Sequence, residues 1–195
     1  MIYLDDGGIA MSLTLEFFYQ KTRYTYNLDL LTASTTLNKK ITWVYLLDDV
    51  HNSSFIRGGE LIITTGLITK SSQKLDHLIN EAYIKGACGA IINTGMYIKN
   101  VPSRIIEFGE ENNFPIFSMP WETHIADIMQ EYCNEIISEQ KIASLKNNVF
   151  LRSILHSSSS EDKQILSQFI GFRIAASKMP LNILYFAKVE LDNIY

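Results

Sequence analysis

Three short apolar segments that alternate with two helical patterns constrain the fold of this chain most strongly. The segments are Leu61–Ile63, Ala87–Ile92 and Phe114–Met119. Runs that are apolar throughout are typical of strands buried on both faces of a sheet. The order strand, helix, strand, helix, strand predicts an α/β fold, with a mainly parallel sheet built from βαβ units and helices on both faces.

The two segments between these strands have the spacing and the end signals of helices. In the first, apolar side chains recur at helical intervals, at Leu75, Leu78, Ile79, Ala82 and Tyr83. Gly86 follows, and glycine accepts the positive φ that is common just after a helix. In the second, Pro102 suits a first helical turn, and Asn112–Asn113 provide a stop.

Upstream of this unit, the sequence predicts a short helix over Leu13–Tyr19 and strands over Leu28–Ala33 and Ile41–Leu47. A polar loop then begins at Asp48 and Asp49. Adjacent residues in a strand point to opposite faces, and in a loop we expect both carboxylates to be solvated. The pair is therefore not expected to act as two converging catalytic carboxylates.

Four consecutive parts are expected along the chain. Residues 1–10 have neither a strand nor a helix period and precede a second methionine, Met11, so they form an extension outside the fold, native or artificial. Residues 11–122 form the α/β domain. Residues 123–156 carry an apolar stripe without Pro or Gly and form a long connecting helix. Residues 157–195 open with a serine run and begin a second α/β domain, truncated because so few residues cannot bury a core.

The connecting helix leaves two arrangements open. Its stripe includes Ile128, Tyr132 and Ile136, which recur every four residues and then give way to a polar stretch. Such a helix either joins two copies of the chain in a homodimer or packs on its own domain.

Composition and charge exclude several classes of function. The net charge is −4 and no basic cluster is visible, which argues against nucleic-acid binding by this segment. No apolar run approaches the ~18 residues that span a bilayer, and no signal peptide is visible. We therefore expect a cytoplasmic protein that does not associate with membranes.

Metal, cofactor and catalytic sites are also not expected. The four histidines have no paired spacing, and Cys88 and Cys133 have no metal-ligand spacing, so we interpret both cysteines as buried free thiols. No glycine-rich nucleotide loop and no set of nucleophile and base is visible. The sequence thus predicts no catalysis.

Polar residues follow each of the three apolar strands, and in a parallel sheet these strand ends share one edge. Their hydroxyls, amide, backbone N–H groups and aromatic face suit a small, polar, planar ligand. The alternative is that threonine and glycine simply make good turns and that the tryptophan packs the end of the sheet. The predicted ligand-binding residues are Thr64, Thr65, Gly66, Asn93, Thr94, Gly95, Trp121 and Glu122.

A tight turn precedes the first of these strands, at Arg57, Gly58, Gly59 and Glu60. We expect Arg57 and Glu60 to neutralise each other across the two glycines, in a structural role. The alternative is that either side chain faces the ligand pocket.

Several motifs in the same order resemble one family. They are Ile41–Val44, Phe55–Gly66, Gly86–Ile92, Val101–Pro102 and Phe114–Pro120. Together, over roughly Leu13 to Ile137, they resemble the N-terminal domain of PucR-type purine-catabolism transcriptional regulators. The segment at 157–195 resembles the start of the GGDEF-like middle domain of such regulators.

This resemblance implies a bacterial regulator whose front domain senses a small-molecule effector, such as a purine or ureide metabolite, or a protein partner. In that family a C-terminal helix-turn-helix domain binds DNA, and nothing in this sequence corresponds to it. Two alternatives remain. Gly58–Leu61 and Gly66, with Gly86–Ala87, also resemble the N-terminal substrate domain of muramyl ligases. The domain could instead be a pure dimerisation module.

Overall fold

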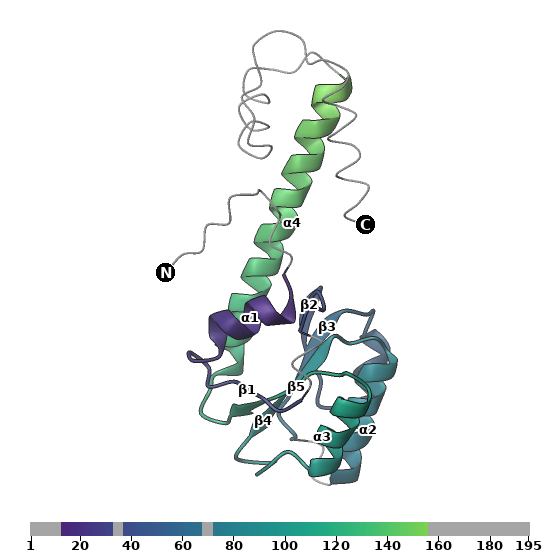
Figure 1. Cartoon of the computed structure of the whole chain (residues 1–195), viewed down its shortest axis with the longest axis vertical. Coiled ribbons are helices and arrows are strands. Elements are labelled where there is room, and N and C mark those ends of the chain that lie inside the picture. Colours follow the sequence, from purple (N-terminus) through teal and green to yellow (C-terminus); the bar gives the residue numbers. More distant parts are fainter. Residues whose placement is uncertain (1–12, 33–36, 68–71, 156–195) are drawn as a thin grey trace. The chain divides into compact units, whose positions relative to one another are not determined.

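The computed structural model describes residues 13–32, 37–67 and 72–155. The extension predicted at residues 1–10 and the second domain predicted at residues 157–195 lie outside the described residues. The elements follow in the order α1 (Leu15–Thr22), β1 (Asp29–Leu30), β2 (Trp43–Leu46), the 3-10 helix η2 (Val50–Phe55), β3 (Glu60–Thr64), α2 (Ser72–Ile84), β4 (Gly89–Thr94), α3 (Ser103–Glu111), β5 (Ile116–Pro120) and α4 (Ile125–Leu155) (Figure 1).

The described strands form one sheet in the order β1-β5-β4-β3-β2. Strands β2 to β5 run parallel, and β1 pairs with β5 antiparallel. The succession β3–α2–β4–α3–β5 confirms the predicted α/β fold with its mainly parallel sheet. The strand predicted over Leu28–Ala33 is present as β1, a two-residue antiparallel edge at Asp29–Leu30. The polar loop predicted after β2 contains the 3-10 helix η2, with Asp49 as its N-cap.

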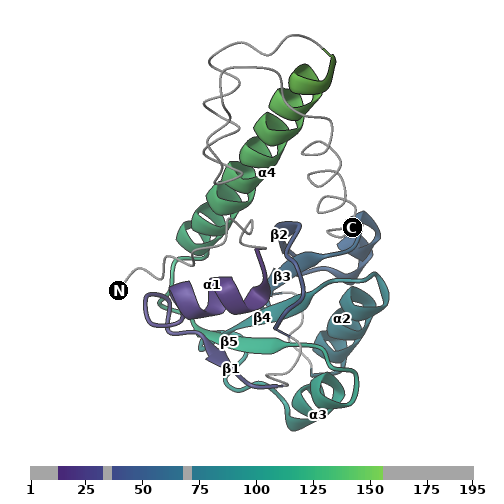
Figure 2. The same cartoon turned by 45° about the horizontal axis from the view of Figure 1, so that its top comes forward.

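Helices cover both faces of the sheet, as predicted, with α1 and the start of α4 on one face and α2 and α3 on the other (Figure 2). Alternation of side chains along each strand divides the core accordingly. In β3, Leu61 and Ile63 join the hydrophobic cluster under α1 and α4, whereas Ile62 joins the cluster under α2 and α3. All three are almost fully buried, which explains why the segment is apolar without interruption.

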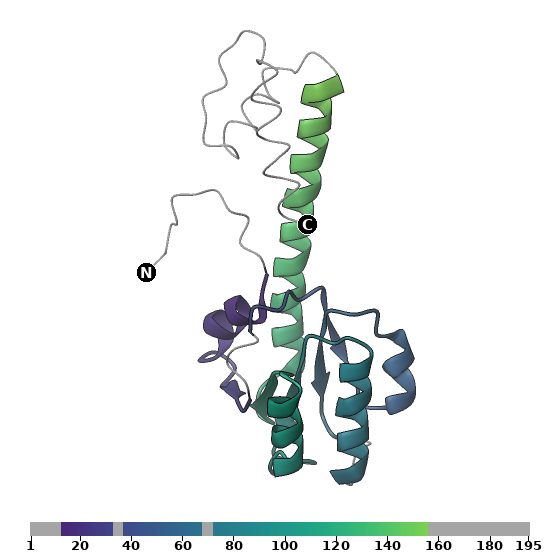
Figure 3. The same cartoon turned by 45° about the vertical axis from the view of Figure 1, so that its right-hand side comes forward.

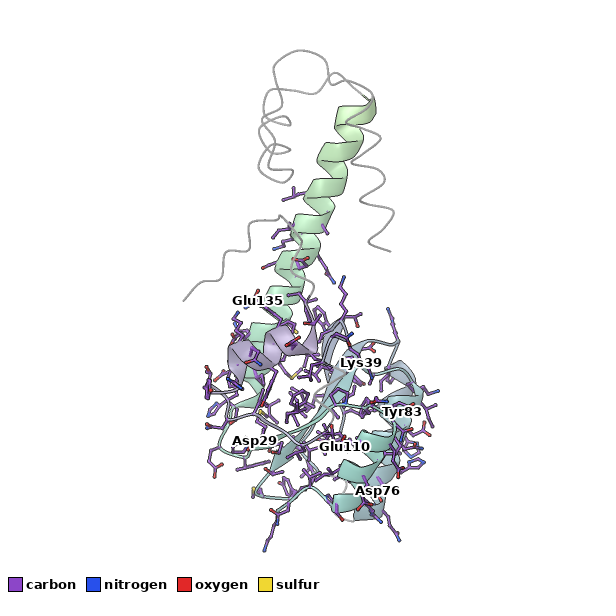
Figure 4. All side chains as sticks on the ribbon, viewed as in Figure 1. Asp29, Lys39, Asp76, Tyr83, Glu110 and Glu135 are labelled. Atoms are coloured by element: carbon purple, nitrogen blue, oxygen red, sulfur yellow. The ribbon has the colours of Figure 1, made fainter. Side chains whose placement is uncertain are left out.

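Helices α2 and α3 stand side by side (Figure 3). An ion pair between Asp76 of α2 and Arg104 of α3 joins them. On α2, the ring of Tyr83 meets Phe108 and Phe114 edge-on, with centroids 5.5 and 5.7 Å away. Figure 4 labels Asp76 and Tyr83 on this layer. The apolar stripe and the Gly86 stop predicted this helix correctly, since α2 ends at Ile84 and Gly86 has φ +83°.

The first part of α4 packs onto the sheet domain through Tyr132. This side chain is 1% exposed, its ring centroid lies 4.3 Å from that of Phe18, and its hydroxyl lies 2.6 Å from the Thr22 hydroxyl of α1. Ile128 and Ile136, one turn away on either side, belong to the same hydrophobic cluster. This half of the helix therefore packs on its own domain, which is one of the two arrangements that the sequence left open.

Polar contacts reinforce the α1–α4 contact at its rim. Lys21 forms ion pairs with Glu131 and Glu135 of α4, and the hydroxyl of Tyr26 donates to Glu131 at 2.7 Å. Glu135 is labelled beside α1 in Figure 4. Partial burial lowers the pKa of Lys21, but the two carboxylates outweigh it and the net shift is upward. Burial, together with the bond to Glu131, raises the pKa of Tyr26 to about 12.

Glu139 is the last residue of the compact unit that contains the sheet, and the remainder of α4 belongs to a second unit. In that remainder, Ile142 and Leu145 are 40% and 55% exposed. Large apolar side chains at a spacing of three residues lie on one side of a helix.

The glycine turn before β3 lies at the amino edge of the sheet and is held by backbone contacts. The Glu60 carboxylate, which is buried, accepts hydrogen bonds from the amides of Arg57 and Gly58 at 2.9 and 2.8 Å. Gly59 has φ +81°, and its amide donates to the carbonyl of Gly86 at 2.7 Å. The Glu60 carboxylate thus stabilises the turn by binding the backbone amides of Arg57 and Gly58. The sequence had suggested that it would pair with the side chain of Arg57.

Both cysteines are free thiols. Burial raises the pKa of the Cys88 thiol to about 12, and burial also raises the pKa of Cys133, which is half-buried. A thiol with a raised pKa holds little thiolate at neutral pH and is a poor nucleophile.

Candidate functional site

The three predicted strand ends lie at one edge of the sheet. Strands β3, β4 and β5 are parallel neighbours, with Thr64 opposite Ile92 and Thr94 opposite Pro120. Their carboxyl ends therefore open on the same side, where open α/β sheets bind ligands. The glycine turn of Arg57 to Glu60 lies at the other end of β3, roughly 15 Å away along five residues of strand.

The polar groups that follow β3 are bound by an aspartate from the end of β2. Asp48 Oδ1 accepts from the Thr64 hydroxyl at 2.9 Å, the Thr65 amide at 2.7 Å and the Gly66 amide at 3.2 Å. Asp48 Oδ2 accepts from the Thr65 hydroxyl at 2.6 Å. We call these four residues the Asp48 network. Thr64 and Gly66 are buried, and in the structure the hydroxyl and amides predicted to meet a ligand donate to the Asp48 carboxylate.

The polar groups that follow β4 also bond within the protein. The side chain of Asn93 is 1% exposed, and its amide nitrogen donates to the carbonyl of Pro120 at 3.0 Å. Its Oδ1 atom has no hydrogen-bond partner in the described part of the chain. The hydroxyl of Thr94 makes a long contact, 3.4 Å, with the carbonyl of Met119. These side chains tie β4 to β5.

Trp121 and its neighbours form the exposed part of this edge. Trp121 and Tyr97 are 38% and 37% exposed, and their rings meet edge-on with centroids 5.4 Å apart. Gly95 has φ +137°, and a Cβ atom there would lie 2.8 Å from the Cβ of Trp121. Gly95 therefore makes room for the tryptophan, while Glu122 is exposed to solvent.

A pocket of about 350 Å³ opens beside the Asp48 network. We call it the edge pocket. It is lined by residues 48–51, at the end of β2 and the start of η2, and by Gln73, Lys74 and His77 of α2. Its volume lies at the lower end of the range for small-molecule sites, about 300–1,000 Å³. Asp48 belongs both to the pocket lining and to the Asp48 network.

The edge pocket does not contain the residues that the sequence selected. Of the predicted ligand-binding residues, none lines it, although Thr64, Thr65 and Gly66 bond directly to Asp48. The missed residues are Asp48, Asp49, His51, Lys74 and His77. One sequence signal could have pointed to Lys74 and His77. They are three residues apart and so lie on one side of the predicted helix, away from its apolar stripe, shortly after the end of a predicted strand.

Metal binding and membrane insertion find no support in the described ranges. Among residues 13–32, 37–67 and 72–155, no group of three or more His, Cys, Asp or Glu side chains is placed to hold a metal ion. No helix in those ranges is long and apolar enough to cross a membrane.

The chain is similar to known regulators over its sheet domain. Residues 20–136, more than half of the chain, match the model of the purine catabolism regulatory protein-like family, PucR. A relative from Bacillus subtilis (strain 168), "Purine catabolism regulatory protein", is 26% identical over 112 residues, which cover 57% of this chain and 21% of the relative. No solved structure matches the chain.

The matched residues run from the end of α1 to the part of α4 that packs on the sheet, so the comparison covers every described strand. The family is one of regulators and not of enzymes, in agreement with the prediction that the chain is not catalytic. On these grounds, the chain belongs to the PucR family of purine catabolism regulatory protein-like regulators.

Proposed function

We propose that this chain contains the effector-sensing domain of a bacterial PucR-type transcriptional regulator, and that it controls a helix-turn-helix DNA-binding domain elsewhere in a longer protein. The effector would be a small metabolite of purine or nitrogen catabolism, and the name of the Bacillus subtilis relative favours purine catabolism. The family match supports regulation, and the relative is about five times as long as the matched part.

The observation that carries the sensing role is the edge pocket. It lies at the carboxyl edge of a parallel sheet, inside the residues that match the family. Its lining includes Asp48, which bonds to the loop that follows β3. A ligand that contacts Asp48 would therefore act directly on a loop that leads towards α2.

Transmission would follow a shift between two populated conformations. Helix α4 is suited to this role because it begins on the sheet and runs for 31 residues, roughly 45 Å at 1.5 Å per residue. Tyr132 packs the first half of α4 against α1, so a rearrangement of the sheet domain would also move α4.

A thermal-shift screen of the chain against purines, ureides and amino acids tests the sensing role. A ligand at 100 times its dissociation constant stabilises the folded state by about 2.7 kcal/mol, and this raises the melting temperature measurably. Unrelated sugars at equal concentration serve as the control. If no metabolite in the panel shifts the transition beyond the sugars, small-molecule sensing loses its support.

We also propose that the protein is a homodimer, joined through the second half of α4. The exposed Ile142 and Leu145 support this contact. Replacing both with glutamate is expected to convert a dimer to a monomer in sedimentation velocity. Ile84→Glu, at an apolar side chain that is 60% exposed on α2, is the matched control and should leave the dimer intact. A double variant that stays dimeric would exclude this interface.

Family membership favours regulation over the alternative of a muramyl-ligase-type substrate domain. The exposed residues of α4 favour a role in dimerisation, but a pure dimerisation module would need no pocket at the edge of the sheet. Sensing and dimerisation are therefore combined in the proposal.

A further inference from the structure

The edge pocket has two walls that differ in charge. One wall comes from the end of β2 and the start of η2 and contributes the carboxylates of Asp48 and Asp49. The other comes from the first turns of α2 and contributes the ammonium group of Lys74 and the imidazole of His77. A small ligand between the walls would meet a negative and a positive group.

The two aspartates are not equally available to a ligand. Asp48 accepts four hydrogen bonds, two from backbone amides and two from hydroxyls, and these occupy most of its lone pairs. Asp49 lines the pocket and accepts one hydrogen bond, to Oδ1 from the amide of His51 at 3.0 Å, so its Oδ2 atom accepts none from the described residues. Asp49 is therefore the carboxylate that retains capacity for a ligand donor.

Lys74 is the matching cation. Its side chain is exposed, and among the described residues no ion pair or hydrogen bond engages it. The imidazoles of His51 and His77 are also exposed and add groups that either donate or accept. Val50 is the apolar member of the lining, so the pocket offers no aromatic wall of the kind that Tyr97 and Trp121 form elsewhere on the edge.

We propose that the edge pocket binds a small zwitterionic metabolite of the α-amino-acid class. Lys74 pairs with its carboxylate and Asp49 with its ammonium group. The two pairings are complementary in sign, and a pocket of about 350 Å³ accommodates a molecule of this size. The proposal rests on the proposed sensing function and specifies its ligand. A neutral, flat ring is disfavoured as the ligand, because it would form no ion pair with either wall of the pocket.

Calorimetric titration of the chain with each of the twenty common L-amino acids tests this assignment. At least one is expected to bind, and the matching compound that lacks the carboxylate or the amine is expected to bind at least ~10-fold more weakly, because it loses one charge-assisted contact. Lys74→Ala and Asp49→Asn are each expected to weaken binding by a similar factor.

Lys85→Ala is the matched control, because Lys85 is an exposed lysine just beyond the other end of α2 and should not alter binding. Two results would overturn the assignment while leaving metabolite sensing intact. One is amino-acid binding that Lys74→Ala and Asp49→Asn leave unchanged, and the other is binding only of uncharged purines or ureides. Failure of every class to bind would overturn both proposals.

Discussion

Replacing Tyr132 with alanine is expected to lower the free energy of unfolding of the sheet domain by about 3–5 kcal/mol, the usual cost of truncating a buried aromatic residue. Tyr132 is 1% exposed, its ring lies against Phe18, and it belongs to the cluster between α4 and the sheet. The truncation leaves a cavity that the neighbouring strands cannot close. Urea denaturation followed by circular dichroism measures the loss.

Tyr132→Phe is the matched control. It removes only the hydroxyl, and the Thr22 hydroxyl keeps its bond to the carbonyl of Phe18 at 2.6 Å. The expected cost is about 1 kcal/mol, that of one hydrogen bond. If the alanine variant were as stable as the phenylalanine variant, α4 would not be part of the folded domain. The boundary expected from the sequence, between the α/β domain at residues 11–122 and the connecting helix, would then be correct.

Replacing Asp48 with alanine is expected to destabilise the domain by about 2–4 kcal/mol. The change removes the acceptor of four hydrogen bonds and leaves the buried Thr64 hydroxyl and the Thr65 and Gly66 amides without it. Bonds to a charged group contribute about 1.5–3 kcal/mol each, but water replaces some of them because Asp48 is only half-buried. Urea denaturation gives the energy, and hydrogen exchange of the Thr65 and Gly66 amides should accelerate.

Its neighbour provides the control. Asp49 accepts one bond, from the amide of His51, at the N-cap of a short 3-10 helix. Asp49→Ala is therefore expected to cost below ~1 kcal/mol. Equal effects at the two adjacent positions would show that the Asp48 network does not hold the loop after β3.

The order of strands and helices was predictable because burial on both faces leaves a local signature. Leu61–Ile63 lie in β3 and Ala87–Ile92 lead into β4, and each side chain of these segments other than Gly89 belongs to one of the two hydrophobic clusters. Gly86 was predictable for a similar reason, because only a residue that tolerates positive φ suits that position. Once these strands are taken as parallel neighbours, their carboxyl ends must lie at the same edge of the sheet.

The role of Asp48 was not predictable, because its partners lie 16–18 residues away in the sequence. Nothing local distinguishes it from Asp49, and only the parallel pairing of β2 with β3 brings it to Thr64 and Gly66. The edge pocket was missed for the same reason, since it joins a loop after β2 to side chains of α2. The sequence located the edge but not the side chains that line the pocket there.

The sequence predicted a strand over Leu28–Ala33, but the antiparallel direction of β1 was beyond sequence reasoning. Strand β1 has two residues, and its pairing with β5 joins Asp29 to Ser118 and Leu30 to Phe117, far apart in the chain. A segment so short carries no pattern that shows which strand it pairs with or in which direction.

Amide NMR of the chain, titrated with the purine, ureide and amino-acid panel, tests most directly the claim that this family member senses a metabolite at the edge pocket. We expect at least one compound to shift the amide resonances of Thr65, Gly66, Lys74 and His77 saturably, while those of Gly58 and Gly59 at the opposite edge stay unchanged. If every compound left the first group unmoved, or if the shifts centred on the glycine turn, the edge pocket would not be the sensing site.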